Sequence, residues 1–311
     1  MQKKGAIFME IYESRQGSMP VIRLTDVKYF DVEKTFDCGQ CFRFDRVEAS
    51  SHASEFAGVA HARHVSFAQD GDTLYIYGSD REDFENIWRR YLALDVDYEQ
   101  IDRDILAHDS GSVMRNAMEY GRGIRILRQD AFEAVISFII SQNNNIPRIK
   151  KIIEALSKNS GTPIELCDEA MAHTSGLSSL CAFPDGQALM ALGEKGLFDL
   201  KTGFRAKYIY DAASKLTSGE LDLDALTDTD NTDECIERLC AVKGIGLKVA
   251  SCAALFGLAR YDAFPVDVWM KRVAAKYFPE DTQFSGARFG RYAGIAQQYL
   301  FYYERYHGGE N

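Results

Sequence analysis

The segment Leu239–Cys252 constrains the fold more than any other part of the sequence. A helical pattern that ends near Ala241 is followed by Gly244-Ile-Gly246, and a second, apolar helical pattern begins at Leu247. Glycine adopts backbone conformations closed to other residues, so two glycines separated by one residue predict a tight turn between two helices. They also let backbone N–H groups at the new helix approach an anion such as a DNA phosphate. A plain helix–helix connection with a glycine C-cap remains the alternative for this pattern alone.

Two charged residues near this turn indicate chemistry. Lys248 lies in the first turn of the second helix, where the helix dipole disfavours a cation and so favours the neutral amine that a nucleophile needs. Asp267 follows Pro265 at a position typical of a helix N-cap. Taken singly, Lys248 reads as a phosphate contact and Asp267 as a cap. Together, an amine and a carboxylate at two successive helix starts indicate a nucleophile with an anionic stabiliser.

The order of secondary-structure patterns predicts an α+β chain of two domains. Short strand-like runs occur at 41–45, 55–59, 64–67 and 74–77, and a helical pattern begins at Glu82. We therefore expect an N-terminal antiparallel β domain over residues 1–117 and an all-α domain over residues 118–311. The helices expected in the second domain span 131–142, 147–158, 204–216, 233–241, 247–258, 268–277 and 288–306.

Charge does not settle the nature of the partner. The formal net charge of −10 argues against a nucleic-acid ligand, since phosphate binding uses Lys and Arg. However, residues 219–237 contain eight acidic residues and no base, whereas residues 240–276 contain six bases and two acids. A phosphate meets the local field, so a basic surface can exist on an acidic protein.

Neither a membrane span nor a metal cofactor is expected. The longest apolar windows, 134–140 and 249–259, are shorter than the ~18 residues that a spanning helix needs, and Glu10 and Glu13 interrupt any apolar signal sequence. Among seven cysteines only Cys38 and Cys41 have ligand-like spacing. No cysteine follows Cys252, which excludes a four-thiolate iron–sulfur cluster in the C-terminal region.

The hairpin, Lys248 and Val266-Asp267 together resemble the helix-hairpin-helix GPD DNA glycosylase superfamily. Within it, four further segments resemble the 8-oxoguanine DNA glycosylase/AP lyase family in the expected order, over nearly the whole chain. They are Cys38-Gly-Gln-Cys-Phe-Arg43, Phe138-Ile-Ile-Ser-Gln-Asn-Asn-Asn-Ile-Pro-Arg148, Gly203-Phe-Arg-Ala-Lys-Tyr208 and Ala296-Gln-Gln-Tyr-Leu-Phe301. For the first domain, the resemblance implies an antiparallel sheet like that of the TATA-binding protein.

The resemblance implies a base excision repair enzyme that flips 8-oxoguanine, preferably opposite cytosine, out of the duplex and excises it. Lys248 is then expected to attack C1′ and form a Schiff base that permits β-elimination, while Asp267 stabilises positive charge on the sugar. Because 8-oxoguanine carries a proton on N7, the carbonyl of Gly39 can accept from it and reject guanine. The residues expected around the flipped base are Gly39, Phe138, Cys252, Gln297 and Phe301.

Further DNA contacts follow from the same resemblance. Asn143, Arg148 and Arg205 are expected to contact the orphaned cytosine, with Phe204 as a wedge in the gap. Gly244 and Gly246 are expected to contact phosphate, and Trp269 stands where the family has a histidine, which puts that phosphate contact in doubt. We expect a monomer that binds damaged double-stranded DNA, in a prokaryotic cytoplasm near the nucleoid. No catalytic metal is expected, although the hairpin carbonyls are compatible with a structural cation.

Two alternatives stay open from the sequence. One is another glycosylase of the superfamily, acting on oxidised pyrimidines or alkylated purines. The missing cluster cysteines disfavour the first of these activities and Lys248 disfavours the second. The other is a non-catalytic module that binds duplex DNA through the hairpin, which leaves Asp267 without a role.

Overall fold

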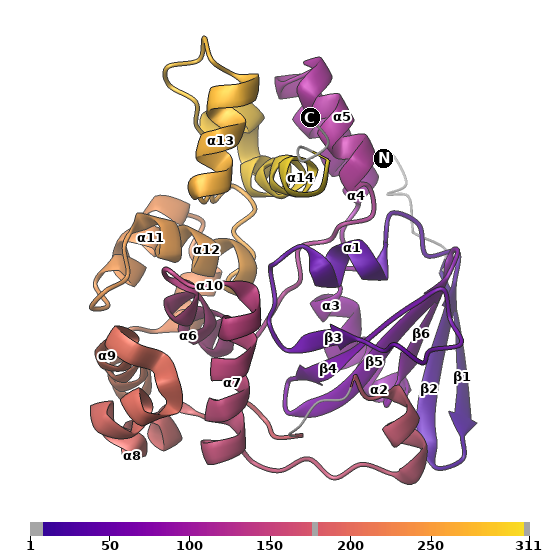
Figure 1. Cartoon of the computed structure of the whole chain (residues 1–311). Helices are drawn as coiled ribbons and strands as arrows, with labels where there is room; N and C mark the ends of the chain where they lie inside the picture. Colours follow the sequence, from indigo (N-terminus) through magenta and orange to yellow (C-terminus); the bar gives the residue numbers. More distant parts are fainter. Residues whose placement is uncertain (1–8, 176–179, 308–311) are drawn as a thin grey trace.

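The computed structural model describes residues 9–175 and 180–307, which form an antiparallel sheet beside layers of helices (Figure 1). The sheet has six strands in the order β1-β2-β6-β5-β4-β3, and every neighbouring pair is antiparallel. The strands are β1 (Glu10–Gln16), β2 (Met19–Thr25), β3 (Phe44–Arg46), β4 (Ser54–Ala60), β5 (Arg63–Asp70) and β6 (Thr73–Tyr77).

Two of these strands, β1 and β2, are absent from the sequence prediction. Strand β1 is an edge strand whose side chains are almost all exposed, so it lacks the apolar alternation that marks a half-buried strand. It forms because its backbone pairs with β2 over its whole length, from Glu10 opposite Thr25 to Gln16 opposite Met19. Pairing between strands, rather than local pattern, therefore defines this edge.

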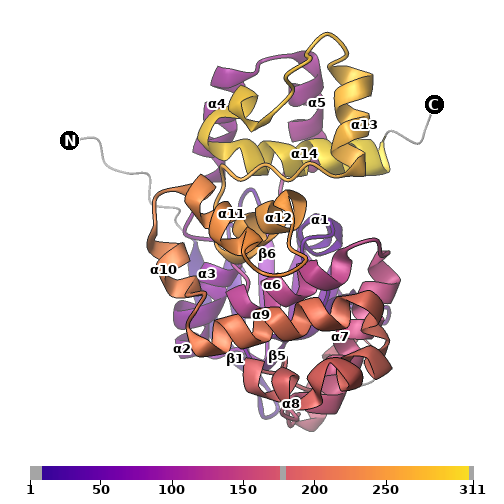
Figure 2. The ribbon, with the colours of Figure 1, turned by 90° about the vertical axis from the view of Figure 1, so that its left-hand side faces the viewer.

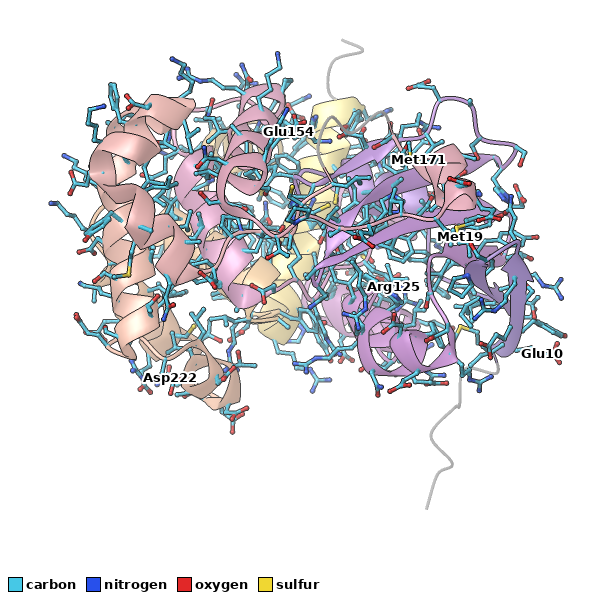
Figure 3. All side chains as sticks on the ribbon, turned by 90° about the horizontal axis from the view of Figure 1, so that it is seen from below. Glu10, Met19, Arg125, Glu154, Met171 and Asp222 are labelled. Atoms are coloured by element: carbon cyan, nitrogen blue, oxygen red, sulfur yellow. The ribbon has the colours of Figure 1, made fainter. Side chains whose placement is uncertain are left out.

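Each face of the sheet has its own apolar layer. One face packs against α1 (Val32–Asp37), the π-helical turn η1 (Phe84–Trp88) and α3 (Arg89–Tyr91), with Trp88 fully buried. The other face packs Met19 and Tyr77 against Ala170 of the 3-10 helix η2 (Asp168–His173). In Figure 3 the short helix that carries Met171 lies over the side of the sheet that carries Met19.

The helices after the sheet share one large core. Helix α6 is buried over most of its length and packs against α7, α9 and α12, while α14 packs against α5 and α13 (Figure 2). The bounds are α2 (Arg81–Asp83), α4 (Tyr98–His108), α5 (Ser112–Gly121), α6 (Ala131–Ser141), α7 (Ile146–Ser160), α8 (Gly186–Leu197), α9 (Ala206–Ser218), α10 (Leu223–Asp228), α11 (Thr232–Cys240), α12 (Leu247–Gly257), α13 (Val268–Tyr277) and α14 (Ala293–Tyr306). The division at residue 117 stays a prediction; α5 spans it and packs against α14.

The prediction of one long helix over residues 288–306 is wrong for its first turns. Residues Gly286–Tyr292 form a 3-10 helix, η5, and α14 begins only at Ala293. Gly290 breaks the helix with φ +67°, and a Cβ there would lie 2.6 Å from Nε2 of His108. The close approach of α4 therefore requires glycine and ends the helical path.

None of the helices within residues 9–175 and 180–307 combines the length and apolarity needed to cross a bilayer.

His64 on β5 is expected to make the stability of the fold depend on pH. Its side chain is buried, its Nε2 has no hydrogen-bond partner among the described residues, and burial lowers its pKa to about 4. A histidine in the unfolded chain takes up its proton near pH 6.5, so the unfolded state binds more protons between these values. The contribution of His64 is therefore fully present above about pH 6.5 and lost as the pH falls to about 4, by roughly 3 kcal/mol.

Urea unfolding of the His64→Leu variant at about pH 7 and about pH 5 measures this effect. We expect the difference in free energy of unfolding between the two pH values to be smaller than in the unmodified protein. The variant His108→Leu, at the exposed end of α4, is the matched control and should keep the original difference. An unchanged pH dependence in His64→Leu would contradict the assignment.

Candidate active site

Lys248 and Asp267 lie at the starts of α12 and α13, as the sequence predicts. Gly246 is the N-cap of α12, and Lys248 is half-buried in its first turn. Asp267 is the N-cap of α13, where one carboxylate oxygen, Oδ1, accepts hydrogen bonds from the backbone N–H of Trp269 and of Met270, both at 2.9 Å. The other oxygen, Oδ2, makes no hydrogen bond to the described residues, which leaves it available to a ligand.

Cys252 interacts electrostatically with both Lys248 and Asp267. It follows Lys248 by one helical turn, so the two side chains share a face of α12. Burial raises the pKa of the Cys252 thiol to about 11, the charge of Lys248 and a hydrogen bond from it lower it, and the charge of Asp267 raises it. The structure therefore brings the predicted nucleophile, carboxylate and pocket cysteine into one site.

Helix α14 adds Gln297 and Phe301 on the same face, one turn apart. Gln297 is 4% exposed, and its Oε1 is buried with no hydrogen-bond partner among the described residues. Phe301 is half-buried and meets the ring of Trp269 edge to face, with 6.2 Å between centroids. Trp269 thus supports Phe301, and the guanidinium of Arg272 lies 4.8 Å from the Trp269 ring centroid. The phosphate contact of Trp269 stays a prediction.

Gly39 lies directly beside Phe301. Its φ is +79°, a conformation that glycine adopts without strain. A Cβ on Gly39 would lie 4.0 Å from Cε1 of Phe301 and 3.7 Å from Cδ1 of Ile146. Gly39 and Phe301, to which the resemblance assigns lesion reading and the base pocket, are distant in sequence but adjacent in the structure.

Two buried glutamines hold the Gly39 loop, and the sequence analysis missed both. Gln298 donates from Nε2 to the carbonyl of Cys38 at 2.9 Å. Gln40 donates to the carbonyls of Thr35 and Arg125, each at 2.8 Å, and accepts from the N–H of Leu127. The signal available was a glutamine next to each predicted pocket residue, in otherwise apolar surroundings. These bonds hold the residues on either side of Gly39.

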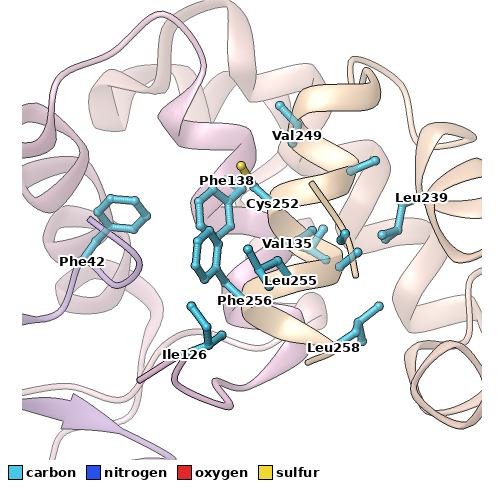
Figure 4. Close-up of a cluster of buried hydrophobic side chains, with 14 of the residues drawn as sticks. Phe42, Ile126, Val135, Phe138, Leu239, Val249, Cys252, Leu255, Phe256 and Leu258 are labelled. Atoms are coloured by element: carbon cyan, nitrogen blue, oxygen red, sulfur yellow. The ribbon is translucent and has the colours of Figure 1, made fainter. Parts of the chain in front are cut away.

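Phe138 is a buried residue, and its predicted contact with the flipped base stays a prediction. Its ring stacks on Phe256 at 5.3 Å between centroids and meets Phe42 edge to face at 5.7 Å. Figure 4 shows this aromatic pair beneath Cys252, on the side of α12 that faces α6. The Phe138 ring is therefore packed against Phe256 and Phe42 and supports Cys252 from below.

Arg205 points inward in this structure, and its predicted contact with the orphaned cytosine stays a prediction. It is 3% exposed, and its guanidinium donates to the carbonyls of Gln142, Asn143 and Thr202. Burial and the nearby charge of Arg148 lower the pKa of Arg205. Here Arg205 holds the loop of Asn143, whose φ is +47°, instead of presenting its donors outward.

The residues around Arg205 remain open to a ligand. Phe204 is half-exposed beneath the Arg205 guanidinium, which lies 4.4 Å from its ring centroid. Arg148 and Asn143 are exposed, and Arg148 lies in the first turn of α7, which Asn145 caps. The predicted wedge and two of the three predicted opposite-base residues therefore lie side by side on an accessible surface.

The hairpin turn is braced from behind by α9. Gly244 has φ +82°, and a Cβ there would lie 2.4 Å from the ring of Tyr208. Asp211 accepts from the backbone N–H of Lys243 at 2.8 Å. Gly246, by contrast, has no atom within 4 Å of its Cβ position. The turn is thus rigid on its inner side and open at the N-terminus of α12, where an anion would bind.

Exposed apolar side chains flank the two charged residues. Leu247, next to Lys248, is 73% exposed, and Val266 and Val268, on either side of Asp267, are 42% and 64% exposed. Contiguous exposed apolar groups typically mark binding surfaces. The sequence analysis missed these three apolar residues. Their positions beside Lys248 and Asp267 indicate that this surface binds a ligand.

Within the described residues, no group of three or more His, Cys, Asp or Glu side chains is arranged to hold a metal ion. Cys38 and Cys41 are buried thiols.

The fold and the hairpin with its lysine and aspartate define a base excision DNA glycosylase of the helix-hairpin-helix GPD class. Residues 136–287 match the family model described as HhH-GPD superfamily base excision DNA repair protein. Residues 22–135 match the model described as 8-oxoguanine DNA glycosylase, N-terminal domain. The chain belongs to the 8-oxoguanine DNA glycosylase family, and the predicted fold class and family are confirmed.

Individual relatives agree with this placement. The N-glycosylase/DNA lyase of Saccharomyces cerevisiae is 35% identical over 165 residues, which is 50% of this chain and 42% of the yeast protein. The structure of MBOgg1 in complex with a low-affinity DNA ligand is 39% identical, with a TM-score of 0.84 over 96% of this chain and 100% of that chain. The 8-oxoguanine glycosylase/lyase of Clostridium acetobutylicum, in complex with double-stranded DNA containing cytosine opposite 8-oxoG, is 35% identical. Its TM-score is 0.85, over 97% of this chain and 100% of that chain.

Proposed function

We propose that this protein is a bifunctional DNA glycosylase and AP lyase that excises 8-oxoguanine from duplex DNA. The observation that carries the proposal is the interaction of Cys252 with both Lys248 and Asp267, at the start of the helix whose Trp269 contacts Phe301 next to Gly39. Membership of a family that includes the Clostridium 8-oxoguanine glycosylase/lyase supports the substrate class. Damaged double-stranded DNA is accordingly the proposed partner.

The reaction begins when the damaged nucleotide leaves the stack and enters the pocket. The Lys248 amine attacks C1′, the N-glycosidic bond breaks, and its electron pair leaves with the purine. Positive charge develops on the sugar during this step, and the unbonded Oδ2 of Asp267 is placed to stabilise it. The C1′–O4′ bond then breaks, a proton passes from the attached amine to O4′, and the bond between Lys248 and C1′ becomes that of a Schiff base. Loss of a C2′ proton then expels the 3′ phosphate and nicks the strand.

Recognition of the base uses groups that lack partners in the protein. The buried Oε1 of Gln297 is an acceptor without a donor, which is costly unless a ligand supplies one. The Watson–Crick edge of guanine carries N–H donors that meet this requirement. The carbonyl of Gly39 accepts from the N7–H that 8-oxoguanine has and guanine lacks, so the site rejects the normal base.

We further propose a preference for cytosine opposite the lesion. Arg148 and Asn143 are exposed on the surface that carries Phe204, the proposed wedge, and Arg205 holds the backbone at Gln142 and Asn143. Arginine donates only, and cytosine offers the acceptors O2 and N3 on the edge that the flipped base vacates. Movement of the Arg205 side chain on DNA binding would add a second guanidinium to this recognition.

Five further properties complete the proposal. The reaction uses only the lysine and the carboxylate, so we propose that it requires no cofactor. A structural cation at the carbonyls of the 244–246 turn is compatible with it. We propose that the protein acts as a monomer without a membrane partner, and that it works at the nucleoid in a prokaryotic cytoplasm.

Single-turnover base release from a panel of duplexes tests the proposed substrate. The panel contains 8-oxoguanine opposite each of the four bases, together with thymine glycol, 3-methyladenine and undamaged guanine. We expect release of 8-oxoguanine opposite cytosine to be faster than opposite adenine by ~10-fold or more, the range for loss of one good base contact. Preferred release of thymine glycol or 3-methyladenine would assign another activity of the superfamily, and binding without release from any duplex would favour a non-catalytic module.

A further inference from the structure

The face of α14 that lines the pocket extends one turn past Phe301. Gln297, Phe301 and Arg305 follow one another at intervals of four residues, so they share one face of the helix. The guanidinium of Arg305 lies 6.0 Å from the ring centroid of Phe301 and 4.8 Å from that of Tyr306. Arg305 is therefore a neighbour of the proposed base pocket.

Arg305 makes no hydrogen bond or ion pair within the described part of the chain, and its Nη1 is buried. Other arginines with a buried, unpartnered nitrogen still have polar partners. Arg43 bonds to the Cys181 carbonyl, Arg89 pairs with Glu85, and Arg260 bonds to the carbonyls at 226 and 227. A buried cationic donor without an acceptor is costly, and the rings of Phe301 and Tyr306 offer it no hydrogen-bonding oxygen in these contacts.

The unpartnered nitrogen faces the Gly39 loop. Nη1 of Arg305 lies 3.5 Å from the position that a Cβ on Gly39 would occupy. Tyr306 holds Asp37, which lies two residues before Gly39. The Tyr306 hydroxyl lies 3.0 Å from the carbonyl oxygen of Asp37 and 2.9 Å from its carboxylate. In Figure 1, α14 lies above α1, whose C-terminal end leads into this loop. The unpartnered donor of Arg305 thus lies next to Gly39, the residue expected to read N7 of the base.

We propose that Arg305 is an additional base-recognition residue, which donates a hydrogen bond to a purine carbonyl oxygen beside N7 of the flipped 8-oxoguanine. The inference rests on the proposed function. In 8-oxoguanine, the carbonyl oxygens O6 and O8 flank the N7–H that Gly39 accepts. A guanidinium has donors and no acceptor, so it complements either oxygen and acquires the partner it lacks.

The test replaces Arg305 with Met, which keeps the apolar stem and removes the donors. Three quantities are measured: single-turnover release of 8-oxoguanine opposite cytosine, nicking of a preformed abasic site, and affinity for a duplex containing tetrahydrofuran in place of the damaged nucleotide. We expect base release to fall on the order of 10- to 100-fold, as for loss of a hydrogen bond to a charged donor. Nicking of the abasic site and affinity for the tetrahydrofuran duplex involve no damaged base. Both should therefore equal those of the unmodified protein.

Controls separate recognition of the base from other roles. Arg103→Met on α4 removes an exposed guanidinium whose partners among the described residues are Glu99 and Gln100, and should leave all three quantities unchanged. Arg305→Lys keeps a charged donor, so its loss of base release should be smaller than that of Arg305→Met. This second variant keeps the test valid if the Met variant folds poorly. A substrate with 8-oxoadenine, which lacks O6, distinguishes the two acceptors: the effect of Arg305→Met persists if O8 accepts and disappears if O6 does.

Two results would overturn the inference while leaving the proposed function intact. One is release of 8-oxoguanine by Arg305→Met at the unmodified rate. The other is an equal loss of base release, nicking and tetrahydrofuran affinity, which would make Arg305 a structural or general DNA-binding residue. Failure of the proposed function is distinct, because then the unmodified protein itself releases no 8-oxoguanine, and the inference falls with it.

Discussion

The Lys248→Gln variant is expected to lose base release and strand nicking together, on the order of 10³-fold or more, because both steps need the same amine. Its affinity for a duplex with 8-oxoguanine opposite cytosine should change little by comparison. Lys248 is half-buried, in an N-terminal turn whose backbone N–H groups and hairpin remain in place to bind phosphate. Single-turnover kinetics and a gel-shift titration measure the two properties on the same protein.

The same substitution at Lys158, an exposed residue near the end of α7, provides the matched control. Lys158→Gln should keep full base release and nicking. If Lys248→Gln still releases 8-oxoguanine at the unmodified rate, water is the attacking group and Lys248 is a phosphate contact. If it loses affinity and turnover in equal measure, its main role is binding.

The Asp267→Asn variant is expected to fold normally and to release 8-oxoguanine 10²- to 10³-fold more slowly, roughly the loss seen when an electrostatic stabiliser of a transition state is removed. Oδ1 of Asp267 caps α13, and an asparagine oxygen can accept the same two bonds from Trp269 and Met270. The charge of the carboxylate is what the substitution removes. Thermal unfolding and single-turnover kinetics therefore separate the two functions of this residue.

Asp130→Asn controls for the effect of replacing an aspartate N-cap with asparagine outside the proposed site. Asp130 caps α6 by accepting from the N–H of Glu133 at 2.9 Å, and it is exposed and outside the proposed site. This variant should retain both stability and activity. If Asp267→Asn also keeps the full rate, the carboxylate is a helix cap without a chemical role.

The parts of the site that the sequence predicts are those fixed by short-range geometry. Lys248 and Asp267 follow a glycine turn and a proline, and such signals set where helices begin regardless of tertiary context. The strands with an apolar pattern and a turn, such as β5 and β6, are predicted for the same reason. Edge strand β1 is not, because its register comes from β2.

The orientation of individual side chains depends on contacts between distant segments and is not predicted. Arg205 turns inward because the carbonyls of Gln142 and Asn143 lie within its reach, about sixty residues earlier in the chain. Phe138 is enclosed by Phe42 and Phe256, which come from two other segments. Periodicity places such residues on a helix face but does not show what covers that face.

The Gly39 loop shows the same limit over a longer range. Its support comes from Gln298, 260 residues later in the chain. A single sequence contains no signal that pairs these two segments, apart from the family resemblance. The recognition proposed for Arg305 depends on this contact and could be inferred only after the fold placed α14 against the loop.

Borohydride trapping on a duplex with one 8-oxoguanine opposite cytosine tests the central claim most directly. Borohydride reduces a Schiff base to a stable amine, so the lysine that attacked C1′ stays covalently attached to the DNA. We predict one adduct on the 8-oxoguanine strand, mapped by peptide sequencing to Lys248, and none with Lys248→Gln or with undamaged guanine. Release of 8-oxoguanine without any adduct, or an adduct at another residue, would contradict the account.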